Sequence, residues 1–221
     1  MFDVNETMLD LGALDPLFVD WFGHPVTRKE WFAQTLHFAM TLAATGAFKS
    51  FSEVGTTALE EVARRHHATL PDNAASRLRE AMVRLPAHPD VDPALRLLRD
   101  AGLATAALSN NPLPVVTAQL RHTGLTPLFT EIMSVDEVGA LKPAPEVYQF
   151  ASRRLGLAPR SVWMVAAHGW DIAGAKRAGL RGAFVARSGQ SPDPFAPPEI
   201  IAGDLSSIAR AIVDAERLSH P

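Results

Sequence analysis

The chain has no cysteine, no long hydrophobic run and no large excess of charge of one sign. Disulfides and thiol chemistry are therefore excluded, and residence in the reducing cytoplasm is permitted. No segment reaches the roughly 18 uncharged apolar residues that a membrane helix needs. The N-terminus also lacks the basic and then apolar pattern of a signal peptide. We therefore expect a soluble, cytoplasmic protein with no membrane partner.

The charges are nearly balanced, with 21 Lys and Arg against 24 Asp and Glu, and the pI is near 6.2. Such a chain has no basic field to attract nucleic acid, so we expect no nucleic-acid partner. What the chain does contain is 47% hydrophobic residues over a length of 221. This is enough for one good-sized core, or for a core domain with a smaller second domain.

The sequence pattern changes near residue 90. Between residues 16 and 84 the apolar residues recur at helical spacing, with no convincing strand. From Pro93 onward, helical stretches alternate with short apolar runs at residues 103–108, 132–135, 162–167, 183–186 and 200–201. This alternation predicts an α/β fold with a Rossmann-like parallel sheet, helices on both faces and an inserted helical cap. We expect the core to comprise residues 1–14 and 90–221, and the cap residues 15–89. A loop rich in Pro, Gly and Ser at residues 188–198 should precede the last strand and a closing helix.

Polar clusters follow several of the predicted strands. Asp3 comes after a very short first strand, and Ser109 and Asn110 follow the run at 103–108. Residues 168–171 follow the run at 162–167. In open parallel sheets the ligand site lies just beyond the carboxyl ends of the strands. These side chains should therefore converge on one crevice.

Four short segments carry a family resemblance. They are Asp3-x-Asn5-x-Thr7, Leu108-Ser109-Asn110-Asn111, Leu141-Lys142-Pro143 and Ala167-His168-Gly169-Trp170-Asp171. Their order and spacing resemble the motif series of the haloacid dehalogenase superfamily, with a helical cap inserted between the first two motifs. Any one segment alone would be weak evidence, because a Ser-Asn or Lys-Pro pair is common. The longer segments around the first and third motifs, residues 2–7 and 142–148, are most similar to the (S)-2-haloacid dehalogenase branch.

Two residue identities separate this branch from the phosphatases of the superfamily. A phosphatase places an Asp two residues after its nucleophile, as the general acid for a poor leaving group, and this chain has Asn5 there. A phosphatase also holds magnesium with acidic residues of the last motif, and Ala167 occupies a position usually taken by one of them. A halide leaves without protonation or metal. The resemblance thus implies a reaction that needs no metal and no other cofactor.

The resemblance implies a hydrolase that acts on the carbon–halide bond of small 2-haloalkanoic acids. Asp3 would attack the halogen-bearing carbon and form an ester intermediate with inversion. Lys142 would keep Asp3 ionised and oriented, while Thr7 and Ser109 would donate hydrogen bonds to Asp3 or to the substrate.

The remaining roles implied by the resemblance concern the leaving group, the water and the pocket wall. Asn110 would contact the halide or the substrate, Asp171 would position or deprotonate the hydrolytic water, and His168 would assist it or donate to the halide. The expected substrate-binding residues are Asn5, Phe32, Phe51, Tyr148 and Trp170. Other readings stay open, because Ser109 and Asp171 are also typical helix caps and the aromatic residues are typical of core packing.

Two departures from the family pattern stand out. Phe32 takes the place of an Arg that clamps the substrate carboxylate in the dehalogenases, and losing that contact should weaken binding by about 1.5 to 3 kcal/mol. Arg28, Lys49 or a backbone amide would have to compensate. The first strand has only Met1 and Phe2 before Asp3, where about five residues are usual. We therefore expect that residues precede Met1 in the natural polypeptide, with completion of the strand by another chain as the alternative.

Two other functions remain open on the sequence alone. One is a magnesium-dependent phosphatase of small molecules with an atypical acid. The other is a catalytically silent binding protein of the same fold, favoured by Phe32 and the short first strand. The resemblance also suggests a homodimer formed through the helical insert.

Overall fold

The core of the protein is a parallel sheet of short, largely buried strands. The structure is a computed structural model that describes residues 1–187 and 189–219. The strands are β1 (Ala106–Ser109), β2 (Glu131–Ser134), β3 (Trp163–Ala166), β4 (Arg181–Val185) and β5 (Ile200–Ala202). β1 pairs with β2, β3 pairs with β4, and β4 pairs with β5, all in parallel. The predicted runs are thus confirmed as strands, with ends shifted by at most three residues.

Residues at the start of the chain join the two halves of this sheet. Phe2 bridges in parallel to Ala107 on one side and to Val165 on the other. The backbone NH of Phe2 donates to the carbonyl of Ala106 at 2.7 Å, and that of Asp3 donates to Val165 at 3.0 Å. The sheet order is therefore β2, β1, the first residues of the chain, β3, β4 and β5. Asp3 leaves the sheet at its centre, on the carboxyl edge.

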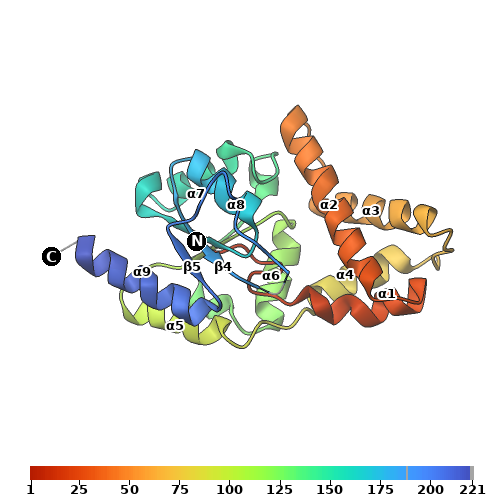
Figure 1. The fold of residues 1–221 in the computed structure, drawn as a ribbon, viewed down its shortest axis with the longest axis horizontal. Coiled ribbons are helices and arrows are strands. Elements are labelled where there is room, and N and C mark those ends of the chain that lie inside the picture. The colour runs from red at the N-terminus through yellow and green to blue at the C-terminus, as the bar shows by residue number, and fades with distance from the viewer. Residues whose placement is uncertain (188, 220–221) are drawn as a thin grey trace.

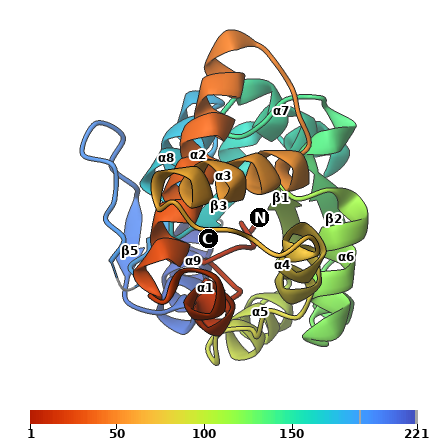
Figure 2. The ribbon, with the colours of Figure 1, turned by 90° about the vertical axis from the view of Figure 1, so that its right-hand side faces the viewer.

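Helices cover both faces of the sheet. α5 (Val91–Asp100) and α9 (Leu205–Ser219) lie together on one side, and α7 (Pro145–Arg154) and α8 (Gly169–Arg177) lie on the other (Figures 1 and 2). α6 (Leu113–His122) packs against β2. α5 shows why these segments fold as they do, because its buried residues recur at i, i+3, i+4 and i+7: Val91, Ala94, Leu95 and Leu98. The predicted α/β class is confirmed.

The insert between the first and second parts of the core consists of helices and connecting loops in the described residues. Its helices are α1 (Asp15–Phe22), α2 (Val26–Thr45), α3 (Phe51–Arg65) and α4 (Ala74–Val83). α2 and α3 pack closely together beside the core (Figures 1 and 2). A capping box of Ser50 and Glu53 starts α3, and the indole of Trp31 on α2 donates to the carbonyl of Gly55 at 2.8 Å. The second of these contacts joins α2 to α3.

The connections between insert and core run side by side. Leu9 and Ala87 form an antiparallel bridge, with Asp10 NH donating to Pro86 at 2.9 Å and His88 NH donating to Met8 at 2.9 Å. The two connections between the insert and the core are therefore hydrogen-bonded to each other.

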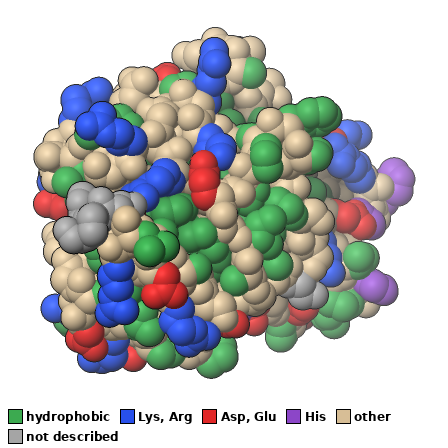
Figure 3. Space-filling model, turned by 60° about the vertical axis from the view of Figure 1, so that its left-hand side comes forward, with side chains coloured by type: hydrophobic (Ala, Val, Ile, Leu, Met, Phe, Trp, Pro, Cys, Tyr) green, Lys and Arg blue, Asp and Glu red, His purple; other side chains and the backbone are tan. Residues whose placement is uncertain are grey.

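A long loop connects the last two strands of the sheet. Between β4 and β5, residues 189–199 contain no helix or strand, as predicted, and Ser188 lies outside the described residues. Within the described part of the chain, no helix is long and apolar enough to cross a membrane. On the face shown in Figure 3, hydrophobic side chains gather centrally while basic and acidic side chains are interspersed around them.

Candidate functional site

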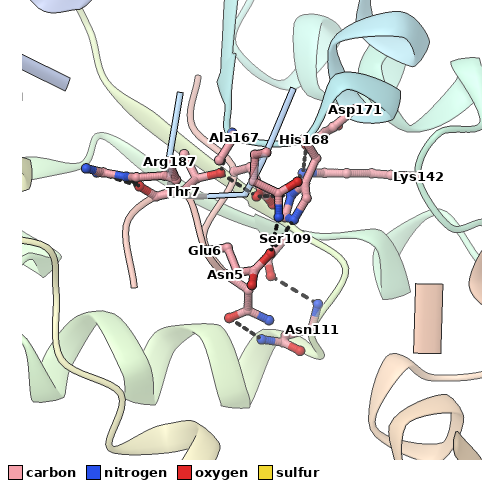
Figure 4. Close-up of polar contacts among 12 residues, drawn as sticks. Asn5, Glu6, Thr7, Ser109, Asn111, Lys142, Ala167, His168, Asp171 and Arg187 are labelled. Atoms are coloured by element: carbon pink, nitrogen blue, oxygen red, sulfur yellow. Dashed lines mark hydrogen bonds and ion pairs between the residues drawn. The ribbon is translucent and has the colours of Figure 1, made fainter. Parts of the chain in front are cut away.

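The predicted nucleophile lies in a set of donors at the carboxyl edge of the sheet. Thr7 Oγ1 donates to Asp3 Oδ2 at 2.7 Å and itself accepts from the backbone NH of Ala167 at 2.9 Å. This second contact leaves the Thr7 proton free to point at Asp3. Lys142 Nζ donates to Asp3 Oδ1 at 3.1 Å. Two of the predicted partners, Thr7 and Lys142, are thus in contact with Asp3, and each binds a different oxygen of its carboxylate. Figure 4 shows the side chains of Thr7, Lys142, His168 and Asp171 close together.

Lys142 joins Asp3 to a second carboxylate. Its Nζ also donates to Asp171 Oδ2 at 3.0 Å, and the Lys142 side chain has no exposed surface. Tyr148 is fully buried and donates its hydroxyl to Asp171 Oδ1 at 2.5 Å. α8 can approach closely because a side chain at Gly174 would collide with Pro143 and Tyr148. Asp171 is therefore held from both sides.

Burial and charge set the ionisation of this cluster. Burial alone would raise the pKa of Asp3, but the Lys142 charge, the neighbouring His168 and the hydrogen bond from Thr7 outweigh it and hold that pKa well below its usual range. The pKa of Lys142 is raised, because the attraction of Asp171 and Asp3 outweighs its desolvation. The pKa of Asp171 is raised, chiefly by burial. Asp3 is thus the carboxylate that stays ionised most firmly, and Asp171 is the better proton acceptor.

A histidine and a glutamate extend the cluster beyond Asp3. His168 Nδ1 lies 3.4 Å from Asp3 Oδ2, and His168 Nε2 lies 2.9 Å from Glu6 Oε2. Gln190 Nε2 donates to the same Glu6 oxygen at 2.8 Å. Burial would lower the pKa of His168, but its contacts with Asp3 and Glu6 raise that pKa to about 9. His168 is therefore an imidazolium at neutral pH.

The residues after β1 shape the site through backbone contacts. Ser109 Oγ accepts from the backbone NH of Asn111 at 3.0 Å, and Asn110 Oδ1 accepts from the backbone NH of Lys142 at 3.0 Å. Among the described residues, no hydrogen bond joins Ser109 to Asp3. Ser109 thus makes a turn-capping contact, and Asn110 positions the segment that carries Lys142.

Asn5 is buried and tied into an amide network. Its Oδ1 accepts from Asn111 Nδ2 at 3.4 Å and from Gln119 Nε2 at 3.3 Å. Gln119 also donates to the carbonyl of Met82 at 2.9 Å, near the end of the helical insert. Through Gln119, Asn5 therefore links the first loop of the core to the insert, and its amide has no acidic proton to give to a leaving group.

The predicted pocket aromatics have different environments. Phe32 is packed against His168, with ring centroids 5.8 Å apart, and it borders a cavity of about 600 Å³ that Glu6 and Gln190 also line. Phe51 borders a separate small cavity of about 40 Å³. Trp170 stacks on His168 at 5.3 Å. For Tyr148 the core-packing alternative holds, because its ring is fully buried behind Asp171.

Two further expectations are settled by these contacts. The alternative that Asp171 caps α8 is wrong, because Asp171 lies inside the first turn and its carboxylate faces Lys142 and Tyr148. Lys49 does not compensate for the missing Arg at position 32, because its side chain is 65% exposed and pairs with Glu53. Arg28 is buried, but its Nε donates to Asp15 at 2.5 Å.

Sequence reasoning missed several members of the site. Glu6 has a positive φ of 61°, which turns its side chain toward His168. Arg187 donates to the carbonyl of Thr7 at 2.9 Å and forms a two-pronged ion pair with Asp90. Glu6 could have been suspected as a charged residue inside the first motif. Arg187 and Gln190 sit in or next to a loop, and no sequence signal marks them.

The site contains an ionised carboxylate, Asp3, which is held by hydrogen bonds from Thr7 and Lys142. It also contains a second carboxylate, Asp171, whose pKa is raised. An ionised Asp can act as a nucleophile, and a neighbouring base can activate water for the following step. Within the part of the chain that the structure describes, no group of three or more His, Asp or Glu side chains is placed to hold a metal ion.

Comparisons with known proteins agree with this geometry. The family model of the haloacid dehalogenase-like hydrolases matches residues 2–179. The chain is 31% identical to (S)-2-haloacid dehalogenase 1 of Pseudomonas sp. (strain CBS-3), over 96% of this chain and 95% of that protein. It is 29% identical to (S)-2-haloacid dehalogenase 4A of Burkholderia cepacia, over 94% and 91%.

The fold of the chain also agrees with that of a solved dehalogenase structure. The L-2-haloacid dehalogenase of Xanthobacter autotrophicus with covalently bound chloropropionic acid superposes with a TM-score of 0.88, at 25% identity and with 96% of each chain covered. The chain belongs to the haloacid dehalogenase-like hydrolase family, in its L-2-haloacid dehalogenase branch.

Proposed function

We propose that this protein is a hydrolytic dehalogenase of small 2-haloalkanoic acids that works through an ester on Asp3. The observation that carries the proposal is the buried ion pair between Lys142 and Asp3, which keeps the Asp3 carboxylate charged and aimed. An unprotonated carboxylate is what displacement of a halide from carbon requires. The covalently bound chloropropionic acid of the Xanthobacter relative supports the same chemistry.

In the first step an oxygen of Asp3 attacks C2 of the acid from the side opposite the halogen. A carbon–oxygen bond forms, the carbon–halogen bond breaks, and the halide leaves with its electron pair. Lys142 and Thr7 hold the Asp3 carboxylate in one orientation. The nucleophile therefore loses little conformational entropy when the substrate binds. The product of this step is an ester between Asp3 and the inverted C2.

In the second step water attacks the carbonyl carbon of the Asp3 ester. Asp171 accepts the proton of this water, since burial raises its pKa toward that of a useful base. Tyr148 and Lys142 fix the Asp171 carboxylate during the transfer. The tetrahedral intermediate then breaks its bond to the alkoxide, which takes the proton back from Asp171. The 2-hydroxy acid is released, and Asp3 returns to its carboxylate form as its remaining proton passes to solvent.

Two residues argue against phosphoryl transfer as the reaction. Asn5 stands where a general acid would serve an alkoxide leaving group, and its carbonyl is already taken by Asn111 and Gln119. Ala167 supplies only a backbone NH, which Thr7 accepts. Neither position offers the proton or the negative charge that a phosphatase of this superfamily would use.

Halide release measured with and without a chelator tests the proposal. The purified protein should release chloride from 2-chloropropionate at the same rate in buffer and in excess EDTA. A folded protein that releases no halide from 2-chloropropionate or fluoroacetate would contradict it. Magnesium-dependent hydrolysis of p-nitrophenyl phosphate would instead identify a phosphatase, and binding of carboxylates without turnover would identify a silent binding protein.

A further inference from the structure

Arg187 joins a backbone carbonyl of the first loop to a carboxylate of the segment that returns from the insert. It follows β4, and its side chain and that of Asp90 are each 15% exposed. Arg187 Nη1 and Nη2 each donate to one oxygen of Asp90 at 2.9 Å. Nη2 and Nε also donate to the carbonyl of Thr7, at 2.9 and 3.3 Å. Figure 4 shows Arg187 beside Thr7 and well apart from Lys142.

Asp90 is in turn held by the backbone of the last helix. The NH of Leu205, at the start of α9, donates to Asp90 Oδ2 at 2.7 Å. Burial would raise the pKa of Asp90, but hydrogen bonds from Arg187 and Leu205 bring that pKa below its usual range. Asp90 is therefore ionised at neutral pH and anchored to the core. The two-pronged pair with Asp90 then directs the remaining donors of Arg187 at Thr7.

Thr7 connects this ion pair to the nucleophile. Its side chain is fully buried, and its Oγ1 donates to Asp3 Oδ2 at 2.7 Å while accepting from the backbone NH of Ala167 at 2.9 Å. The hydroxyl belongs to the same short residue whose carbonyl Arg187 holds. A shift of the Thr7 backbone would therefore move the hydroxyl away from Asp3.

The backbone just before Thr7 is in an unfavourable conformation. Glu6 has a φ of 61°, in the left-handed region that residues with a Cβ seldom adopt. Such a conformation persists when the surrounding contacts over-determine it. On one side the NH of Glu6 donates to the carbonyl of Leu9 at 2.8 Å, and on the other side Arg187 holds the carbonyl of Thr7. Without Arg187, the peptide after Glu6 would be free to relax.

We propose that Arg187 is a positioning residue of the dehalogenase: through the Thr7 carbonyl it fixes the Thr7 hydroxyl that orients Asp3. This inference rests on the proposed function. Among the described residues, the hydrogen bonds of the Arg187 side chain go to Thr7 and Asp90, so Arg187 acts on the nucleophile through Thr7 alone. A lysine would not replace it, because a single ammonium lacks the planar fork that holds both partners.

The test is a double-mutant cycle on halide release. Arg187→Met should lower kcat for 2-chloropropionate by about 10- to 100-fold and change KM by less than about 3-fold, because the nucleophile loses its orientation. In a Thr7→Val background the same substitution should cause no further loss, because the hydroxyl that Arg187 positions is already absent. Losses that multiply in the double variant would show a separate structural role and would overturn the inference.

Lys176→Met is the matched control. Lys176 Nζ donates to Glu199 at 2.6 Å, and Glu199 also accepts from the backbone NH of Gly182 at 2.7 Å. This pair thus has the same design as the pair of Arg187 and Asp90, but it does not contact Thr7. The variant should keep the wild-type kcat. Arg187→Lys serves if Arg187→Met does not fold, and a wild-type kcat in either folded Arg187 variant would contradict the inference.

Amide hydrogen exchange gives a readout that does not depend on turnover. In Arg187→Met the NH of Ala167, which is bonded to Thr7 Oγ1, should exchange at least about 10-fold faster than in the wild-type protein. The NH of Leu108, bonded to the carbonyl of Phe2 at 2.9 Å, should keep its rate. An unchanged Ala167 rate, or equal acceleration at both amides, would overturn the inference. Absence of halide release by the wild-type protein, with Ala167 alone accelerated in the variant, would defeat the proposed function and leave the link from Arg187 to Thr7 supported.

Discussion

Replacing Asp3 by Asn should abolish halide release, with kcat falling by at least about ten-thousandfold, because the substitution removes the carboxylate that forms the ester. An amide is a poor nucleophile, and Lys142 would face it without a charge to orient. The measurement is chloride release from 2-chloropropionate by freshly purified protein, with mass spectrometry to exclude deamidation of the introduced amide. Circular dichroism should show an intact fold, since the side chain changes little in size.

Asp92→Asn is the control for this experiment. Asp92 is a surface carboxylate that accepts from Arg96 at 2.7 Å within α5. Its side chain is 50% exposed and is paired with Arg96 outside the Asp3 cluster, so activity should stay at the wild-type level. If Asp3→Asn retained a tenth of the wild-type rate, Asp3 could not be the nucleophile.

Replacing Lys142 by Met should cost both activity and stability. The substitution leaves Asp3 and Asp171 buried near each other without the cation that lies between them. Breaking a buried ion pair from one side typically costs about 3 to 5 kcal/mol of unfolding free energy. Halide release should fall to background, because the two carboxylates would take up protons and Asp3 would lose its charge. Urea unfolding monitored by circular dichroism measures the stability change.

The pH dependence of that change has a definite sign. In the wild-type protein the pKa of Asp3 is lower in the folded than in the unfolded chain, so this group stabilises the fold above about pH 4 and loses its effect as pH falls. The pKa of Lys142 is raised on folding, so its contribution is present throughout the neutral range. The deficit of Lys142→Met should therefore be largest near neutral pH and shrink in acid. Lys49→Met, on an exposed pair with Glu53, should change stability by less than about 1 kcal/mol; an equal loss in both variants would contradict the account.

The sequence predicted the centre of the site because strand ends converge by geometry. Asp3 and the segment before α8 follow neighbouring parallel strands, so their side chains meet at one edge of the sheet. The motif order then placed Lys142 beside Asp3, and the structure has this contact. The direction of Asp171 could not be read in the same way. In the sequence, an Asp just before an apolar helical stretch fits a cap equally well, and only the packing of α7 against α8 brings Tyr148 to it.

The outer part of the site could not be predicted, for reasons that lie in the backbone. The contact of Glu6 with His168 depends on a left-handed residue, which sequence patterns rarely indicate outside glycine. Gln190 reaches Glu6 from a loop, where the chain path depends on tertiary packing. The substitution of Phe32 for an Arg was visible in the sequence. The sequence did not indicate that the pKa of His168, which lies beside Asp3, is raised.

A single-turnover reaction in water enriched in ¹⁸O tests the central claim most directly. With protein in excess over 2-chloropropionate, each Asp3 reacts at most once, and the ester is cleaved at the Asp3 carbonyl. The account predicts that the lactate formed carries unlabelled oxygen from Asp3, while the peptide containing Asp3 gains ¹⁸O by mass spectrometry. Labelled lactate together with an unlabelled Asp3 peptide would show direct attack by water and would contradict the account.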